Sequence, residues 1–286
     1  MTARKSSQSA PKSSRPAPRK PRAPRRSSRR RGRSSRRGNG VGRWLALSVG
    51  ALLAPALLAG LLWLFVRPLF WTGGQPIADL SDYNVHGIDI SHHQPGVDWE
   101  RLRGDSLHGF PLRFVIMKST EGTDHRDTRF ADYFPRARRA GFIRGAYHYF
   151  RPGSDARAQA RFFLRNTPLC SGDLPAILDV EERGSRPADA FRAEVLTWLR
   201  TVEEATGRPP ILYTGVSFKQ RYLQGEAFDA YPLWVAHYNG RRAPRYRGPW
   251  VMWQYTEQGR VKGIRGPVDL DVFNGKIQDL QALCLP

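Results

Sequence analysis

Between residues 86 and 273 the chain alternates short apolar runs with longer, more polar segments, and this alternation restricts the fold most strongly. Eight runs of six to eight residues are rich in β-branched and aromatic side chains, a composition typical of strands. They span 86–91, 113–119, 143–150, 175–181, 209–215, 232–238, 251–256 and 268–273. Helical patterns lie between early runs, at 129–140, 155–165 and 187–206. The alternation predicts a largely parallel sheet.

Eight strands within about 190 residues predict an α/β fold, an irregular TIM-like (β/α) barrel. Only 12 residues separate Tyr238 from Val251, too few for a full crossover helix with its loops. We therefore expect the barrel to be irregular over its last three strands. The barrel domain is predicted to occupy residues 86–286.

The N-terminal region has a different composition from the rest of the chain. Residues 1–43 hold 16 of the 46 Lys and Arg residues and no acid, and consist mostly of Arg, Ser and Pro. Such a segment cannot bury enough apolar surface to offset its ordering entropy, so we expect a disordered basic tail. Because the excess charge lies mainly in this tail, the high pI is no sign that the folded part binds nucleic acid, which is an unlikely partner.

Residues 44–66 form an uncharged segment that favours a transmembrane helix. As a helix, 23 residues would be about 34 Å long, against a hydrocarbon core of about 30 Å. A cleaved signal peptide is the alternative, but its apolar core is typically about 7–15 residues and is followed by a small-residue cleavage site. The positive-inside rule then predicts a single-pass membrane protein with a cytoplasmic N-terminus. Residues 67–85 would be a linker, and the domain would be periplasmic or extracellular, with membrane lipid as a partner of the anchor.

Acidic residues gather at the ends of the predicted strands. They are Asp89, Glu121, Asp179, Glu181, Asp269 and Asp271. Burying a carboxylate is costly unless it is paired or hydrogen-bonded. In a β/α barrel the carboxyl ends of the strands form the active-site face, so these side chains are expected to converge there.

The spacing of Asp179 and Glu181 suggests a chemistry. Residues i and i+2 of a strand point to the same side, with Cα atoms about 6.5–7 Å apart. Like charges this close raise the pKa of one carboxyl, which leaves one acid protonated beside an ionised neighbour. Glycosidic bond cleavage needs this combination. For an isolated D-x-E motif, a structural ion-paired role stays open.

Aromatic and polar side chains at the strand ends support a sugar-binding site. Tyr147, Tyr213, Trp234, Trp253 and Tyr255 lie in or at the ends of predicted strands. Flat rings stack on sugar faces, although a single ring of this kind more often belongs to the core. Gln254 and Glu121 complete the candidate substrate-binding residues.

The domain resembles the N-acetylmuramidases (lysozymes) of glycoside hydrolase family 25. The matching stretches are GIDIS…Q…VDW (87–99), FVIMKSTEG (114–122), AGFIRGAYHYF (140–150), PAILDVE (175–181), PPILYTG (209–215), LWVAHY (233–238) and VMWQYTEQGRVKGIRGPVDLDVF (251–273). The resemblance implies a modified β/α barrel that hydrolyses the β-1,4 bond between N-acetylmuramic acid and N-acetylglucosamine in peptidoglycan glycan strands.

The same resemblance assigns roles to four carboxylates. It places the family's acidic cluster on Asp89, Asp179, Glu181 and Asp269, with Glu181 as proton donor and Asp179 as the assisting carboxylate. It implies no metal and no organic cofactor. The chain departs from the family pattern in the loop that carries His92 and His93.

Two other functions stay open: a non-catalytic peptidoglycan-binding module, and a hydrolase for another N-acetylated glycan. The sequence also leaves open the oligomeric state and whether Cys170 and Cys284 form a disulfide.

Overall fold

The computed structural model describes residues 80–286. The predicted basic tail (1–43), transmembrane helix (44–66) and most of the predicted linker (67–85) lie outside these residues. Across the described part of the chain, no helix combines the length and apolar character needed to cross a bilayer.

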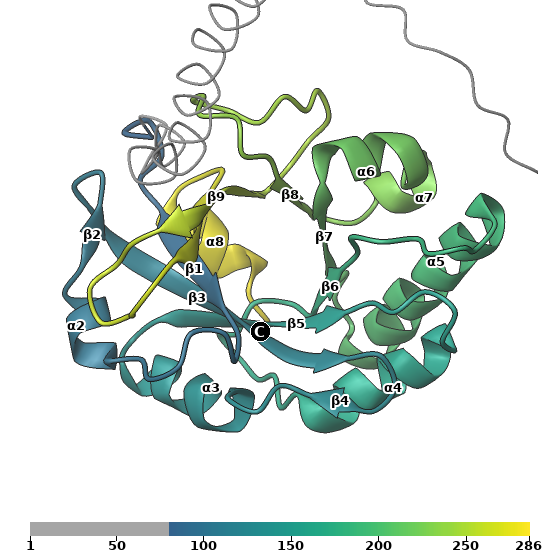
Figure 1. Cartoon of the computed structure of the whole chain (residues 1–286), viewed down its shortest axis with the longest axis horizontal. Helices are drawn as coiled ribbons and strands as arrows, with labels where there is room; N and C mark the ends of the chain where they lie inside the picture. Colours follow the sequence, from purple (N-terminus) through teal and green to yellow (C-terminus); the bar gives the residue numbers. More distant parts are fainter. Residues whose placement is uncertain (1–79) are drawn as a thin grey trace, which may run out of the picture. The chain divides into compact units, whose positions relative to one another are not determined.

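Eight strands close into a barrel (Figure 1). They are β1 (His86–Ile90), β3 (Phe110–Glu121), β5 (Ile143–Tyr149), β6 (Ile177–Asp179), β7 (Ile211–Gly215), β8 (Leu233–Ala236), β9 (Met252–Gly259) and β10 (Val268–Phe273). Pairing runs in this order from β1 to β10, and β10 closes the ring by pairing with β1. All neighbours are parallel except β10, which is antiparallel to both β9 and β1. The predicted strands and the irregular barrel are confirmed.

Helices cover the outside of the parallel strands (Figure 1). The three predicted helices are confirmed as α3 (Phe130–Arg139), α4 (Ala156–Asn166) and α5 (Ala188–Thr206). α4 begins where the Asp155 carboxylate accepts a hydrogen bond from Ala158 N at 2.6 Å, and α5 ends at Gly207, whose φ of 68° favours glycine. The sequence did not predict the shorter elements. These are α2 (Trp99–Arg103), β2 (Ser106–Leu107), β4 (His125–Arg126), α6 (Val216–Tyr222), α7 (Glu226–Asp229) and α8 (Ile277–Leu283).

Side chains alternate between the barrel interior and the layer beneath the helices. One buried cluster includes Phe114, Ile116 and Ile177, whereas their neighbours Val115 and Leu178 belong to a separate cluster. This alternation follows from the period of two along a strand. The interior is therefore filled by apolar side chains over part of its length, and the polar inward positions fall beyond them toward the carboxyl ends of the strands.

Gly87 allows the interior to be filled beside β1. A Cβ atom at this position would lie 2.3 Å from the Phe114 ring, closer than any real Cβ contact. The ring thus occupies the space that a side chain at position 87 would need. Gly87 lies two residues before Asp89 on the same face of β1, so the packed ring lies below this carboxyl.

The folded domain begins before His86. Leu80 and Val85 are buried, and the Tyr83 ring packs against Trp250 and Trp253 with centroid distances of 6.1 and 6.3 Å. The last six residues of the predicted linker therefore belong to the domain.

Both cysteines are free thiols. Cys170 is exposed and accepts a hydrogen bond from Arg138 at 2.6 Å, whereas buried Cys284 donates to the Leu280 carbonyl at 3.3 Å. The disulfide that the sequence left open is not formed in this structure.

A buried ion pair fastens the start of β5 to the loop before β6. Arg144 donates through Nε and Nη2 to both Asp173 carboxylate oxygens, at 2.6 and 3.0 Å, and through Nη1 to the Phe134 carbonyl at 2.9 Å. Both side chains are almost fully buried. Because a buried charge is stable only while its partner remains, each residue depends on the other.

We predict that Asp173→Ala lowers the free energy of unfolding by about 3 kcal/mol or more, because it leaves the Arg144 guanidinium buried and unpaired. Urea denaturation followed by circular dichroism measures the loss. The matched control is Asp132→Ala, which removes the exposed pair between Asp132 and Arg136 and should cost under about 1 kcal/mol. Equal losses in the two variants would contradict the importance of the buried pair.

Candidate active site

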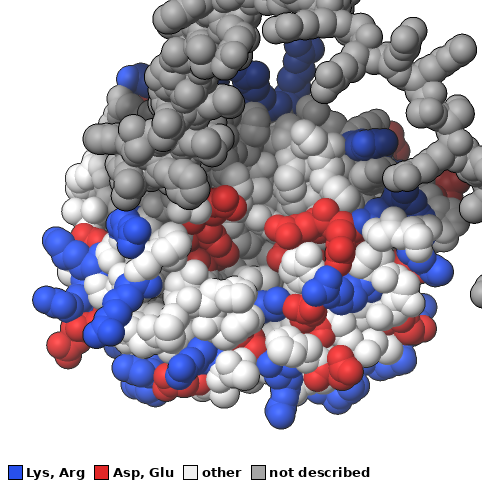
Figure 2. All heavy atoms as spheres, in the orientation of Figure 1, with Lys and Arg blue, Asp and Glu red and all other residues white. Residues whose placement is uncertain are grey.

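A cavity of about 230 Å³ opens at the carboxyl ends of the parallel strands, where five carboxyl groups line its wall. The lining residues are Asp89, Ser91, His93, Lys118, Tyr147, Tyr149, Asp179, Glu181, Tyr213, Trp234, Tyr238, Gln254, Glu257 and Asp269. The space-filling view shows acidic side chains on both sides of a central hollow, with Lys and Arg spread around the outside (Figure 2). We call this cavity the acidic pocket.

Three carboxyls meet where β1 and β10 pair. Asp89 lies opposite Asp269 in the antiparallel ladder, and Asp271 lies opposite Gly87. Directly opposed side chains have Cβ atoms about 5 Å apart on the same face. Asp89 and Asp271 are buried, and Asp269 is partly exposed. These three groups cannot all ionise at neutral pH without strong repulsion.

Burial and mutual repulsion raise the pKa of each of these carboxyls. Burial raises the pKa of Asp89 well above its ordinary value, and the neighbouring Asp271 raises it further. Burial and the charges of Asp89 and Glu257 raise the pKa of Asp269 to about 9. Burial raises the pKa of Asp271 well above its ordinary value, and the charge of Asp269 raises it further. The cluster therefore retains protons at neutral pH.

Gln254 orients Asp89 through its side-chain amide. Its Nε2 donates to Asp89 Oδ2 at 2.7 Å, while its Oε1 accepts hydrogen bonds from the hydroxyls of Tyr213, at 2.8 Å, and Tyr238. Gln254 is almost fully buried. The amide thus has a fixed direction, because two hydroxyls occupy its oxygen and only its nitrogen faces the carboxyl.

Trp234 has a comparable role beside Asp271. Its indole Nε1 donates to Asp271 Oδ1 at 2.9 Å, and its ring contacts the Tyr213 ring with centroids 4.4 Å apart. Trp234 therefore forms part of the floor and supports the carboxyl cluster. Tyr147 and Tyr213, also predicted to bind substrate, line the same pocket.

Asp179 and Glu181 approach the pocket from the end of β6. Asp179 is buried, and among residues 80–286 no group donates to its Oδ1. Burial raises its pKa well above the ordinary value, and the charge of Glu181 adds to this effect. Asp179 and Glu181 therefore both face the acidic pocket, although their environments differ.

Glu181 lies at the pocket mouth, where its side chain is exposed. The surrounding walls still remove enough water from the carboxyl to raise its pKa, although the nearby Tyr213 hydroxyl and the charge of Lys118 oppose this shift. Glu181 is therefore accessible to a ligand and holds its proton to a higher pH than an ordinary glutamic acid.

Glu121, also predicted to contact substrate, belongs to a network beside the pocket and not to its lining. Its Oε2 accepts from Lys118 Nζ at 2.6 Å, and its Oε1 accepts from Arg151 Nε at 2.7 Å. Arg151 also pairs with Glu182. Partial burial opposes the effect, but the two cations lower the pKa of Glu121. Glu121 is thus an ionised residue that holds Lys118 at the pocket.

Trp253 and Tyr255 lie on the opposite side of β9 from the pocket. The Trp253 indole donates to the His237 carbonyl at 3.0 Å, and both rings belong to the outer apolar cluster. Their neighbour Gln254 faces inward, so the period of two turns positions 253 and 255 outward. Trp253, which was predicted to bind substrate, and Tyr255 therefore lie outside the lining of the acidic pocket.

The sequence reasoning did not select Lys118, Tyr149 or Tyr238, yet all three line the pocket. Lys118 follows the inward-facing Ile116 by two residues, Tyr149 follows Tyr147 by two, and Tyr238 continues the series from Trp234. Following the period of two along each predicted run would have found them.

The His92–His93 loop reaches the same pocket. Buried Asp127 accepts hydrogen bonds from the backbone N of His92 at 3.0 Å and pairs with its Nδ1 at 2.7 Å. The His93 ring contacts the His92 ring at a centroid distance of 4.0 Å and lines the pocket. The fixed His92 thereby supports His93 at the rim.

The raised pKa of Asp269 predicts a pH-dependent stability. A carboxyl whose pKa rises from 3.8 to about 9 on folding stabilises the protein below pH 4 and loses this contribution as the pH rises toward 9. We therefore expect Asp269→Asn to lose less stability than the parent between pH 5 and pH 8.5, as measured by urea midpoints. Asp132→Asn serves as the exposed control and should follow the parent. An identical pH dependence in Asp269→Asn and the parent would contradict the shift.

Comparisons with known proteins identify a matching family, relatives and solved structures. The sequence profile described as "Glycosyl hydrolases family 25" matches residues 88–264. The chain is 45% identical over 202 residues to the protein YegX of Escherichia coli K12, covering 71% of this chain and 74% of YegX. It is 36% identical over 222 residues to lysozyme M1 of Streptomyces globisporus, covering 72% of each. The crystal structure of a bacterial lysozyme from Streptomyces coelicolor superimposes with a TM-score of 0.64 at 33% identity, covering 70% of this chain and 97% of that one.

Proposed function

The chain belongs to glycosyl hydrolase family 25, and from this premise we propose that it is a muramidase that hydrolyses peptidoglycan. The bond cleaved is the β-1,4 linkage between N-acetylmuramic acid and N-acetylglucosamine. The lysozymes among its relatives support this substrate. The single observation that carries the proposal is the acidic pocket, where an exposed carboxyl of raised pKa stands beside a buried one.

Glu181 is the proposed general acid. Its exposed position lets a glycosidic oxygen approach the carboxyl, and its raised pKa keeps the proton available for the leaving group. Once the proton has been transferred, the Lys118 ammonium stabilises the resulting carboxylate, because this cation lowers the pKa of Glu181. The group can thus carry a proton before bond cleavage and a negative charge after it.

Asp179 is the proposed assisting carboxylate. It lies two residues before Glu181 at the end of β6, so both groups face the same sugar. Its raised pKa favours the protonated form in the free pocket, which can donate a hydrogen bond that orients the substrate's acetamido group. In its ionised form Asp179 stabilises directly the positive charge that develops at the anomeric carbon. Lys118 favours the ionised form of Asp179.

Asp89 and Asp269 complete the proposed catalytic set, and they act on the ligand from the opposite wall. Their protonated carboxyls donate as well as accept hydrogen bonds, so they can hold sugar hydroxyls or a water molecule. Gln254 fixes the direction of Asp89, and Tyr147, Tyr213 and Trp234 provide the aromatic surface of the pocket.

A binding module without hydrolytic activity would not need an exposed acid of raised pKa. The grouping of Asp89, Asp179, Glu181 and Asp269 around one pocket therefore favours hydrolysis over binding alone. A hydrolase for a different N-acetylated glycan is distinguished by its products. Mass spectrometry of digested peptidoglycan should show N-acetylmuramic acid at the new reducing ends.

We predict that Glu181→Gln lowers kcat on purified peptidoglycan by about 10²–10⁴-fold, because glutamine cannot donate the proton. Release of reducing ends measures the rate. The matched control is Glu182→Gln, which alters the adjacent carboxyl that pairs with Arg151 outside the pocket and should retain most of the activity. Parental activity in Glu181→Gln would refute the assignment.

We also propose that residues 44–66 anchor the enzyme as a single-pass membrane protein. Twenty-three uncharged residues behind a basic segment support this proposal. Residues 1–43 would then stay in the cytoplasm, and the barrel would face the periplasm or the cell exterior, beside the peptidoglycan that it cleaves.

The anchor predicts that the full chain stays with the membrane fraction after a carbonate wash, because its apolar segment lies in the bilayer. A version consisting of residues 67–286 should be released. Immunoblotting of the fractions and N-terminal sequencing of the mature chain provide the measurement. A mature chain that starts after residue 66 would instead identify a cleaved signal peptide and contradict the anchor.

A further inference from the structure

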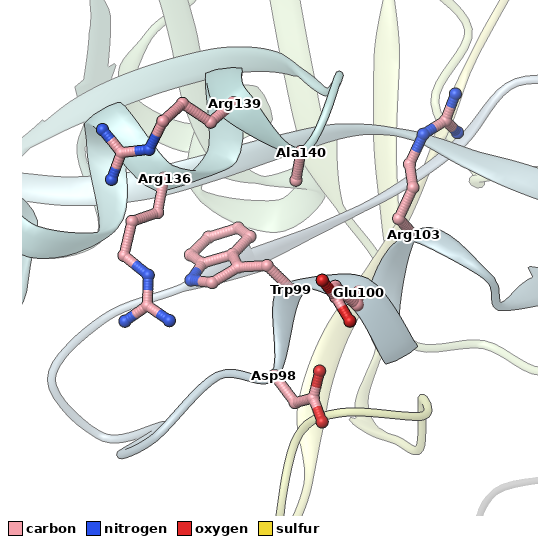
Figure 3. Close-up of a pocket in the computed structure, with 7 residues that line it drawn as sticks. All are labelled: Asp98, Trp99, Glu100, Arg103, Arg136, Arg139 and Ala140. Atoms are coloured by element: carbon pink, nitrogen blue, oxygen red, sulfur yellow. The ribbon is translucent and has the colours of Figure 1, made fainter.

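A second cavity, of about 660 Å³, lies on the outside of the barrel between α2 and α3. We call it the arginine groove. Its lining residues are Asp98, Trp99, Glu100, Arg103, Arg136, Arg139 and Ala140, and none of them lines the acidic pocket (Figure 3). It is larger than the acidic pocket, and the proposed hydrolysis makes no use of it.

Three arginines border this groove from two helices, and the Arg103 guanidinium points away from Trp99, where it donates to the Leu112 carbonyl at 3.4 Å (Figure 3). Arg136 and Arg139 lie in the last turn of α3, and Arg103 ends α2. Within residues 80–286 no hydrogen bond or ion pair engages the Arg139 guanidinium, and the ion pair of Arg136 with Asp132 is exposed. Exposed pairs contribute little, so these cations remain available to a ligand.

The two acids of the groove do not cancel this charge. Asp98 is the N-cap of α2: its Oδ1 accepts from Arg101 N at 3.1 Å, and its Oδ2 lies 4.0 Å from Arg101 Nε. The lining holds three arginines against these two acids, so the groove presents more positive than negative charge.

The Trp99 indole provides an independent observation. Its side chain lies inside the groove, with the nitrogen edge toward Arg136 (Figure 3). Trp99 is only 6% exposed, held between Tyr133 and Phe142 at centroid distances of 5.8 and 6.3 Å. Its Nε1 is buried and donates to no group in the described part of the chain. An unpaired buried donor is costly, and an acceptor that entered the groove beside Arg136 would remove this cost.

We infer that the arginine groove binds an oxyanion, namely a carboxylate or a phosphate group. Planar guanidinium groups match the paired oxygens of these anions, and the indole N–H supplies a further donor. A neutral sugar would leave the charges unmatched, and a cation would be repelled. The site is independent of the acidic pocket and of the proposed hydrolysis.

The indole N–H signals of the full-length chain, labelled with ¹⁵N-tryptophan, provide a direct test. The chain has eight tryptophans, and Trp99→Phe identifies the signal of Trp99 by its loss. Inorganic phosphate and acetate are titrated separately, with chloride at matched ionic strength as the reference. We expect phosphate, acetate or both to move the Trp99 signal saturably, and the comparison identifies which group is preferred.

Variants then assign the contacts. Arg136→Gln should weaken the apparent affinity about 10-fold, since it removes one charged donor, and the double variant with Arg139→Gln should abolish saturation. Arg161→Gln is the matched control, because Arg161 is exposed on α4 and lines neither cavity. All three should keep the circular dichroism spectrum of the parent, which verifies folding, and should hydrolyse peptidoglycan-derived glycan at the parental rate. No saturable movement with either anion, or unchanged affinity in the double variant, would overturn the proposal whether or not the chain is a muramidase.

Discussion

Electrostatic repulsion among carboxyl groups in one confined, poorly hydrated pocket is the constraint on which the function of this molecule depends. Asp89, Asp269 and Asp271 occupy neighbouring positions of a β-ladder, and Asp179 faces them from β6. Such groups can coexist only if some of them remain protonated. The stability of the rest of the fold offsets the unfavourable electrostatic free energy of bringing these carboxyls together. The acids of this set therefore still hold protons near neutral pH.

The barrel makes this arrangement stable by fixing the neighbours of each acid. The Phe114 ring packs against Gly87 below Asp89, and Gln254 directs its amide nitrogen at Asp89 Oδ2. Lys118, held by Glu121, introduces one positive charge on the side of Asp179 and Glu181. The two walls thus differ in character: one holds protonated acids proposed to bind the sugar, and the other holds the pair proposed to react.

Most of the fold could be predicted from the sequence, because strands and helices differ in the period of their apolar residues. All eight strands and the three main helices were predicted, although β3 extends beyond the expected 113–119. The acidic residues were also identifiable, because burying a carboxylate in an apolar strand is costly.

The inward or outward direction of a side chain was harder to predict. Trp253 and Gln254 are adjacent aromatic and polar residues in one run, and only the register of β9 reveals that Gln254 faces the pocket. The network that turns Glu121 toward Arg151 joins residues 30 positions apart, so local sequence contains no signal for it.

The most direct test of this account is a ¹³C NMR titration of the Glu181 side-chain carboxyl in the full chain, assigned by its loss in Glu181→Gln. The account predicts an inflection above 4.5, the ordinary pKa of a glutamic acid, because the pocket walls disfavour the charged form. An inflection at or below 4.5 would show that Glu181 is already ionised where a proton donor is needed, and would contradict the central claim.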